Sequence, residues 1–137
     1  ATPVLVQEIG GKPVAFYSKE QALIDNRSTL QETELNFVSA LQALKPNLTE
    51  IFFVPVKYRV YAQWLPPKLL PNEQWNYLAE AARQAGIPAH DLTPALIAEA
   101  VRLLPQGQYV YWRDDTHWNC NGMRVAAAEV ARILLKQ

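Results

Sequence analysis

The feature that most constrains the fold is the alternation of short apolar runs with helical segments from residue 50 onwards. Three apolar runs have the length of a strand: residues 51–56 (IFFVPV), 87–92 (IPAHDL) and 109–112 (YVYW). A helical pattern follows each of these runs. Strands that alternate with helices usually form a parallel sheet with the helices packed on it. The sequence therefore predicts an α/β fold with a parallel sheet flanked by helices.

The first part of the chain follows a different pattern. Residues 4–9 and 13–17 are β-like runs on either side of a Gly-Gly pair, so we expect an N-terminal β-hairpin. Ser18 is placed to open a helix. Between residues 30 and 44, apolar side chains recur at helical spacing, which predicts an amphipathic helix.

Length and composition indicate one globular domain. The chain has 137 residues, half of them apolar, and its 13 basic residues balance its 13 acidic residues. This balance gives no indication of nucleic-acid binding, and no apolar run is long enough to span a membrane. We therefore expect a single α/β domain over residues 1–137, with a long loop at residues 62–72.

The loop after the last apolar run carries candidate catalytic residues. The stretch RDDTHWNCNG places two aspartates just before His117. Sites in open α/β sheets lie beyond the carboxyl ends of the strands, and histidine is the usual general base near neutral pH. A carboxylate that accepts a hydrogen bond from one ring nitrogen of histidine leaves the other ring nitrogen to take a proton. By spacing alone, both Asp114 and Asp115 could be that carboxylate.

A structural interpretation of the same loop competes with the catalytic one. Asp114 could pair with Arg113, and either Asn119 or Asn121 could cap the helix that follows. Such residues are common in ordinary loops. Position and spacing leave both interpretations open.

The loop also resembles the motif of a known family. DTHWN-x-x-G after a short aromatic strand resembles the signature of SGNH-hydrolase-like proteins of the alginate O-acetyltransferase type. A second stretch, FVPVKYRVYAQWLP, resembles the family's pattern of Pro, Lys and Tyr at a strand end followed by Leu-Pro. The resemblance runs from about residue 50 to the C-terminus. It implies an SGNH- or flavodoxin-like fold and an O-acyltransferase or esterase activity on a carbohydrate or cell-envelope polymer.

Residue by residue, the resemblance assigns roles to four positions. His117 becomes the general base and Asp115 its orienting partner, unless the Asp-x-x-His spacing of ordinary SGNH esterases applies and Asp114 takes that part. Lys57 and Tyr61 fall where the family has polar residues at a strand end, and we take them as candidate substrate contacts. The structural alternative has Lys57 extending its ammonium to the surface and Tyr61 packed in the loop.

Other side chains add candidate contacts or structural roles. Trp64 and Trp118 fall in predicted loops, where their rings could line a sugar-binding groove, and we take Trp118 as a substrate-binding candidate. Trp75 lies on the apolar face of a predicted helix, which is typical of core. His90 is typical of a packed or edge histidine. No ligand spacing supports a metal site, and we expect neither a metal nor a cofactor.

The nucleophile of a Ser-His-Asp site is missing from the sequence. The serines are Ser18, Ser28 and Ser39, and none lies in a Gly-Asp-Ser or Gly-x-Ser-x-Gly turn. Cys120 is three residues after His117, too near along one loop to share a substrate atom with it, and we expect a small buried side chain. In the family that the chain resembles, the serine motif follows the Asp-x-His motif. The resemblance therefore implies a serine beyond the last residue of this chain.

These features support two main hypotheses. In the first, the chain is part of an SGNH-type O-acyltransferase or esterase, carries the Asp-His half of a Ser-His-Asp triad, and is inactive alone. In the second, it is a non-catalytic SGNH-like module that binds polysaccharide or a protein partner. A third has the apolar stripe at residues 30–44 as an interface within a larger assembly. By resemblance alone, we expect an extracytoplasmic location, in the periplasm or cell envelope, and a longer chain of which this is a piece.

Overall fold

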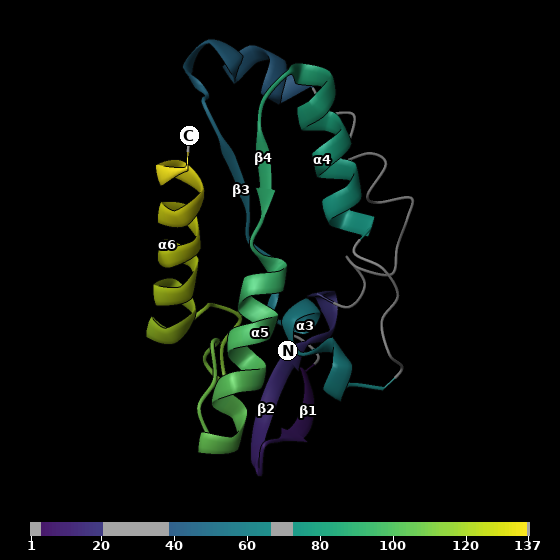
Figure 1. Cartoon of the computed structure of the whole chain (residues 1–137). Helices are drawn as coiled ribbons and strands as arrows, with labels where there is room; N and C mark the ends of the chain where they lie inside the picture. The colour runs from purple at the N-terminus through teal and green to yellow at the C-terminus, as the bar shows by residue number, and fades with distance from the viewer. Residues whose placement is uncertain (1–3, 21–38, 67–72, 137) are drawn as a thin grey trace. The chain divides into compact units, whose positions relative to one another are not determined.

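The computed structural model describes residues 4–20, 39–66 and 73–136 (Figure 1). The chain forms two compact units. The first comprises Ala1–Gln21, Val54–Leu69 and Leu92–Gln137, and the second comprises Ala22–Phe53 and Leu70–Asp91. The expectation that both belong to one domain, itself part of a longer SGNH-like domain, stays a prediction.

An antiparallel hairpin begins the first unit, which confirms the prediction. β1 (Val4–Ile9) pairs with β2 (Lys12–Tyr17) along the whole length of both strands. The two glycines between the strands have φ of 64° and 81°. These left-handed angles favour glycine and match a two-residue turn to the twist of the strands. Val14 and Phe16 alternate along β2 and are fully buried, so one face of the hairpin belongs to the core.

Helices pack against one another in the same unit. α3 (Lys57–Val60) is a single buried turn, α5 (Thr93–Leu103) packs against it, and α6 (Cys120–Leu135) packs against α5. The buried apolar residues of α5 recur at helical spacing: Leu96, Ala100 and Leu103. Burial of one face therefore accounts for this helix, as the periodicity of the sequence predicts. Residues 18–20 are also helical, as expected after Ser18.

The second unit contains the parallel strands. β3 (Ile51–Phe53) pairs in parallel with β4 (Ala89–Asp91), and α4 (Glu73–Ala85) packs against β4. Gly86 ends α4 with a φ of 69°, and the amide of Ile87 donates to a carbonyl of the last helical turn at 2.9 Å. This is the helix end that a glycine at that position predicts.

The parallel sheet is smaller than the sequence predicts. Within the described residues it has two strands, and the predicted strand at residues 109–112 is wrong. Tyr111 forms only an isolated antiparallel bridge with Trp118. The amide of Val110 donates to the hydroxyl of Tyr61 at 3.0 Å, so a side chain takes the place of a neighbouring strand. The α/β class is confirmed, but the extent of the sheet is corrected.

The boundaries of several other elements also differ from the prediction. The run at residues 51–56 is a strand only to Phe53, because Pro55 has no amide hydrogen to donate. The predicted loop at residues 62–72 begins with a 3-10 helix at Ala62–Trp64. Of the helix predicted at residues 30–44, only the part from residue 39 is described, and that part is helical. No helix among the described residues has both the length and the apolar character needed to cross a membrane.

Candidate active site

The histidine loop (residues 111–119) is a tight antiparallel turn. The amide of Trp112 donates to the carbonyl of His117 at 3.1 Å, and the amide of Asn119 donates to the carbonyl of Val110 at 3.0 Å. The chain therefore reverses direction within this loop, and the turn brings the side chain of Asp115 next to His117.

Asp115 holds His117 through two hydrogen bonds. Oδ1 of Asp115 accepts from the backbone amide of His117 at 2.8 Å and pairs with its Nδ1 at 2.5 Å. These two bonds lower the pKa of the Asp115 carboxyl, with the backbone bond contributing most. An ionised carboxylate only accepts, so Nδ1 carries the hydrogen and Nε2 of the neutral ring is an acceptor. Asp115, rather than Asp114, therefore contacts His117, and its catalytic role stays a prediction.

The imidazole of His117 is accessible. The side chain of His117 is 79% exposed and that of Asp115 is 51% exposed. Within the described part of the chain, Nε2 of His117 makes no hydrogen bond, so it is open to a substrate or to another segment. Of the three serines in the sequence, Ser28 lies outside the described residues.

Asn119 fixes where α6 begins. Its Oδ1 accepts from the amides of Asn121 and Gly122 at 3.0 and 3.1 Å, which is the geometry of a helix N-cap. Its Nδ2 donates to the carbonyls of Tyr109 and Tyr111 at 2.8 and 3.2 Å. One amide therefore joins the histidine loop to the helix, and of the two predicted caps Asn119 is the correct one.

Gly122 lets α6 lie directly against the loop. A Cβ at this position would be 2.2 Å from the carbonyl oxygen of Val110 and 3.0 Å from Cβ of Trp118. Glycine thus occupies the inward face of the first helical turn, and Cys120 is exposed. The expectation that Cys120 is a small buried side chain is wrong. The Asn and Gly of DTHWN-x-x-G both have local structural roles.

Lys57 and Tyr61 are buried, each with 1% of its surface exposed. The hydroxyl of Tyr61 accepts from the amide of Val110, and burial raises the pKa of Tyr61 to about 12. The ammonium of Lys57 donates to three backbone carbonyls: Ala15, Arg113 and Asp115. The structural alternative, in which the ammonium of Lys57 extends to the surface, is therefore wrong. A substrate contact by Lys57 would require it to give up one of these carbonyls.

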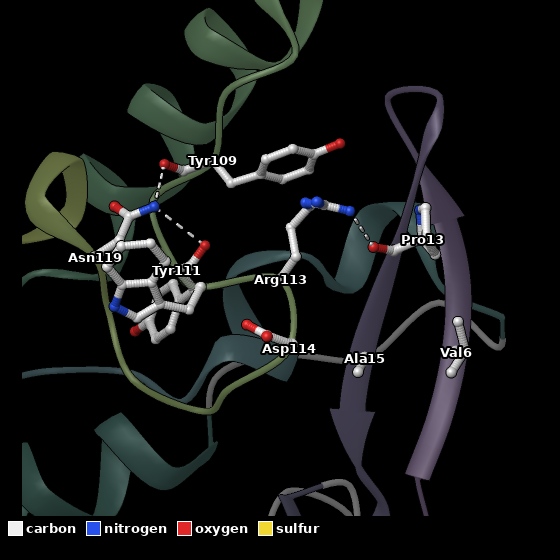
Figure 2. A pocket seen from close by; sticks show the side chains of 9 residues that line it. Val6, Pro13, Ala15, Tyr109, Tyr111, Arg113, Asp114 and Asn119 are labelled. Carbon is white, nitrogen blue, oxygen red and sulfur yellow. Dashed lines mark hydrogen bonds between the residues drawn. The ribbon is translucent and has the colours of Figure 1, made fainter.

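A pocket of about 480 Å³ lies between the hairpin and the histidine loop. Pro13 and Ala15 line it from the hairpin, and Trp112, Arg113 and Asp114 line it from the loop. Figure 2 shows Arg113 directed towards Pro13, whose carbonyl accepts from its Nη1 at 3.1 Å. An aromatic surface beside charged hydrogen-bonding groups is suited to a polar ligand with a flat face.

Trp112 and Trp118 both lie on the histidine loop, and a substrate contact by Trp118 stays a prediction. Trp112 is 52% exposed and lines the pocket, whereas its sequence pattern places it in a strand. Its position directly before Arg113 and the two aspartates is the signal that could have identified it. Trp118 is half-buried, pairs through its backbone with Tyr111, and is not among the residues that line the pocket.

His90 belongs to the second unit. Its Nε2 contacts Oε2 of Glu50, and its ring stacks on Phe52 with centroids 5.1 Å apart. The prediction of a packed histidine is confirmed. Among the residues that the structure describes, no group of three or more His, Cys, Asp or Glu side chains is placed to hold a metal ion.

Comparison with known proteins gives one family. The model of the family described as "SGNH hydrolase-like domain, acetyltransferase AlgX" matches residues 11–137. The match therefore includes β2 as well as the histidine loop, and it extends further towards the N-terminus than the resemblance seen in the sequence.

Two relatives are similar to parts of the chain. The protein named "Probable alginate O-acetylase AlgJ" of Pseudomonas putida is 37% identical over 87 residues, which cover 61% of this chain and 21% of that protein. The solved structure of the O-acetyltransferase domain of Pseudomonas putida AlgJ has a TM-score of 0.69 at 23% identity. That alignment covers 98% of this chain and 48% of that structure, and it supports the fold alone. The chain thus spans about half of the solved relative and about a fifth of the curated one.

Proposed function

The chain belongs to the SGNH hydrolase-like AlgX acetyltransferase family, and we propose that it supplies the Asp-His half of a Ser-His-Asp site for O-acyl transfer. The observation that carries the proposal is the pair formed by Asp115 and His117, at 2.5 Å, on an exposed loop that matches the DTHW motif. The carboxylate fixes the tautomer of the ring and stabilises the imidazolium that forms during proton transfer. Nε2 is then the atom that accepts the proton.

The proposed reaction has two half-reactions. Nε2 of His117 takes the proton of a serine hydroxyl as the serine oxygen attacks the carbonyl of an acyl donor. The donor's leaving group departs with that proton, and an acyl-serine ester remains. A sugar hydroxyl or water then gives its proton to Nε2 and attacks the ester. The imidazolium returns that proton to the departing serine oxygen, which restores the serine and releases the acylated sugar or the free acid. Asp115 stays ionised throughout.

We propose that the serine lies outside this chain, in a segment that follows it. The absence of a serine turn in the sequence and the greater length of both relatives support this part of the proposal. The name of the curated relative makes alginate the first acceptor to test. On the strength of the family resemblance, we propose an extracytoplasmic location, in the periplasm or cell envelope.

Acyl-ester turnover by the natural protein that contains this chain tests the proposal. His117→Ala should abolish turnover of an acetyl ester, because the base that activates the serine is removed. His90→Ala is the matched control, since this histidine packs on Phe52 and Glu50 and has no part in the mechanism. Undiminished turnover in the His117 variant, or equal losses in both variants, would rule out the assignment.

The pocket favours a second candidate function, polysaccharide binding without reaction. Trp112 offers an exposed ring, and Arg113 offers donors that suit the carboxylates or hydroxyls of a sugar chain. If this function is correct, the isolated chain should bind alginate oligosaccharides in a titration, and Trp112→Ala should weaken binding while the exposed Met123→Ala should not. Equal affinity in the wild type and the Trp112 variant would count against it.

A further inference from the structure

Lys57 lies at the junction of the hairpin, α3 and the histidine loop. It is the first residue of α3, and its side chain is almost completely buried. Nζ donates to the carbonyl of Ala15 in β2 at 2.6 Å, and to the carbonyls of Arg113 and Asp115 in the loop at 2.9 and 3.1 Å. All three hydrogens of the ammonium are therefore used, and one cation joins a strand, a helix and a loop.

These contacts reach the imidazole through Asp115. Lys57 holds the carbonyl of Asp115, and the carboxylate of the same residue holds the ring and the amide of His117. The carbonyl of Arg113 also accepts from the amide of Ala15 at 2.7 Å. The main chain is thus held at the residues before and after Asp114, which fixes the direction in which the side chain of Asp115 leaves the backbone.

Packing alone does not explain a lysine at this position, because the burial of its ammonium costs free energy. Burial lowers the pKa of Lys57 to about 8, although the carboxylates of Glu20, Asp114 and Asp115 oppose the fall. The guanidinium of Arg113 adds to it. An apolar side chain of similar length would fill the same space without the cost of removing a cation from water. The ammonium is therefore best explained by the carbonyls that it binds.

The surroundings of Nζ also favour a cation. The ring of Phe16 has its centroid 5.1 Å from Nζ, within range of a cation–π contact. Glu20 is buried nearby, and its Oε2 accepts from the amide of Tyr58 at 3.3 Å. Burial raises the pKa of the Glu20 carboxyl and the nearby ammonium of Lys57 opposes that rise, while the charge of Glu20 in turn opposes the fall in the pKa of Lys57.

We propose that Lys57 is a positioning residue for the Asp115–His117 pair: its buried ammonium holds the histidine loop on β2, in the conformation in which Asp115 bonds to the ring. This role is an alternative to a direct contact between Lys57 and a substrate. It rests on the proposed function of the pair, but its tests need no turnover. It predicts that the tautomer of His117 depends on a residue that does not touch the imidazole.

The isolated chain, labelled with ¹⁵N and ¹³C, allows a direct test by NMR. In Lys57→Met, the protection of the Ala15 amide from hydrogen exchange should fall at least about tenfold, because the loop that accepts from it loses its anchor. The Nδ1–H signature of His117 in ¹⁵N spectra should give way to an average of both tautomers. Lys12→Met is the matched control, since Nζ of Lys12 also binds a carbonyl, that of Gly107, but is exposed and does not contact the loop turn.

Two results would overturn the proposal. The first is a folded Lys57→Met chain that keeps both the protection of Ala15 and the His117 signature. The second result is a pH titration of the wild type, which applies even if the Lys57→Met chain does not fold. As the pH rises through about 8, the amide signals of Ala15 and Asp115 should shift with the same midpoint as ¹³Cε of Lys57. Loss of the Lys57 proton without any shift in those amides contradicts the proposal.

The failure of this proposal and the failure of the proposed function are distinguishable. If Lys57→Met leaves the pair intact, Lys57 only packs, and the pair keeps its proposed role. If His117→Ala leaves turnover intact in the natural protein, the proposed function fails whatever Lys57 does.

Discussion

Gly122→Ala tests the close contact between α6 and the histidine loop. The new Cβ would lie 2.2 Å from the carbonyl oxygen of Val110, where an ordinary contact is at least 3.4 Å. Backbone atoms must therefore separate by about 1.2 Å, the difference between these two distances. The movement would also stretch the hydrogen bond, 3.0 Å long, that the amide of Asn119 donates to the same carbonyl.

The free-energy change combines three contributions. Overpacking of this kind costs about 1–3 kcal/mol. A weakened N-cap at Asn119 adds about 1 kcal/mol, and the higher helix propensity of alanine offsets about 1 kcal/mol. The net loss is about 2 kcal/mol in the free energy of unfolding, which should lower the midpoint of urea unfolding by about 1 M.

Urea unfolding followed by circular dichroism measures this loss. Met123→Ala is the control, because Met123 is the next residue of α6 and is 47% exposed, so its truncation should change the free energy of unfolding by less than about 0.5 kcal/mol. If Gly122→Ala is as stable as the wild type or more stable, alanine behaves as it would in an exposed helix. The explanation given for the glycine of DTHWN-x-x-G would then be refuted.

Three further predictions follow from the site. Asp115→Asn should lower acetyl-ester turnover of the natural protein by a factor of about 10²–10⁴. Asp114→Asn should retain most of the turnover, because only Asp115 bonds to the histidine ring. Equal losses in the two variants would contradict the assignment. The pKa of Lys57 falls from 10.5 to about 8 in the folded chain. Above pH 8 the unfolded chain therefore binds more protons than the folded chain. The free energy of unfolding should then rise with pH, by up to about 2 kcal/mol at about pH 9.5. Urea titrations check this, and the rise should be absent in Lys57→Met; identical pH slopes would count against a buried ammonium. Cys120 is exposed, so a thiol reagent should label it fully in the folded chain, and labelling that requires urea would show that it is buried.

Local sequence signals predicted the features that depend on neighbouring residues. The Gly-Gly pair predicts the hairpin because both turn positions need left-handed angles. Asn119 and Asp115 act on residues two or three positions away, so the cap and the pairing with His117 were accessible from spacing. The spacing left two candidates for each role, and only the path of the turn decided between them.

Long-range contacts explain what the sequence could not predict. Lys57 and Asp115 are 58 positions apart, and no pattern indicates that a lysine after a strand turns inward to bind three carbonyls. The run at residues 109–112 is apolar enough for a strand, but its buried tyrosines point into the first unit and its backbone bonds to its own loop. Apolar composition reports burial, and it does not identify the hydrogen-bonding partner.

The tautomer of His117 tests the central claim most directly. Long-range ¹H–¹⁵N spectra of the isolated chain distinguish a protonated Nδ1 from a protonated Nε2 in the neutral ring, and His90→Gln removes the only other histidine signal. The structure predicts hydrogen on Nδ1, held by Asp115, with Nε2 unprotonated and available as a base. A ring that carries its hydrogen on Nε2, or one that is unchanged by Asp115→Asn, would contradict the account.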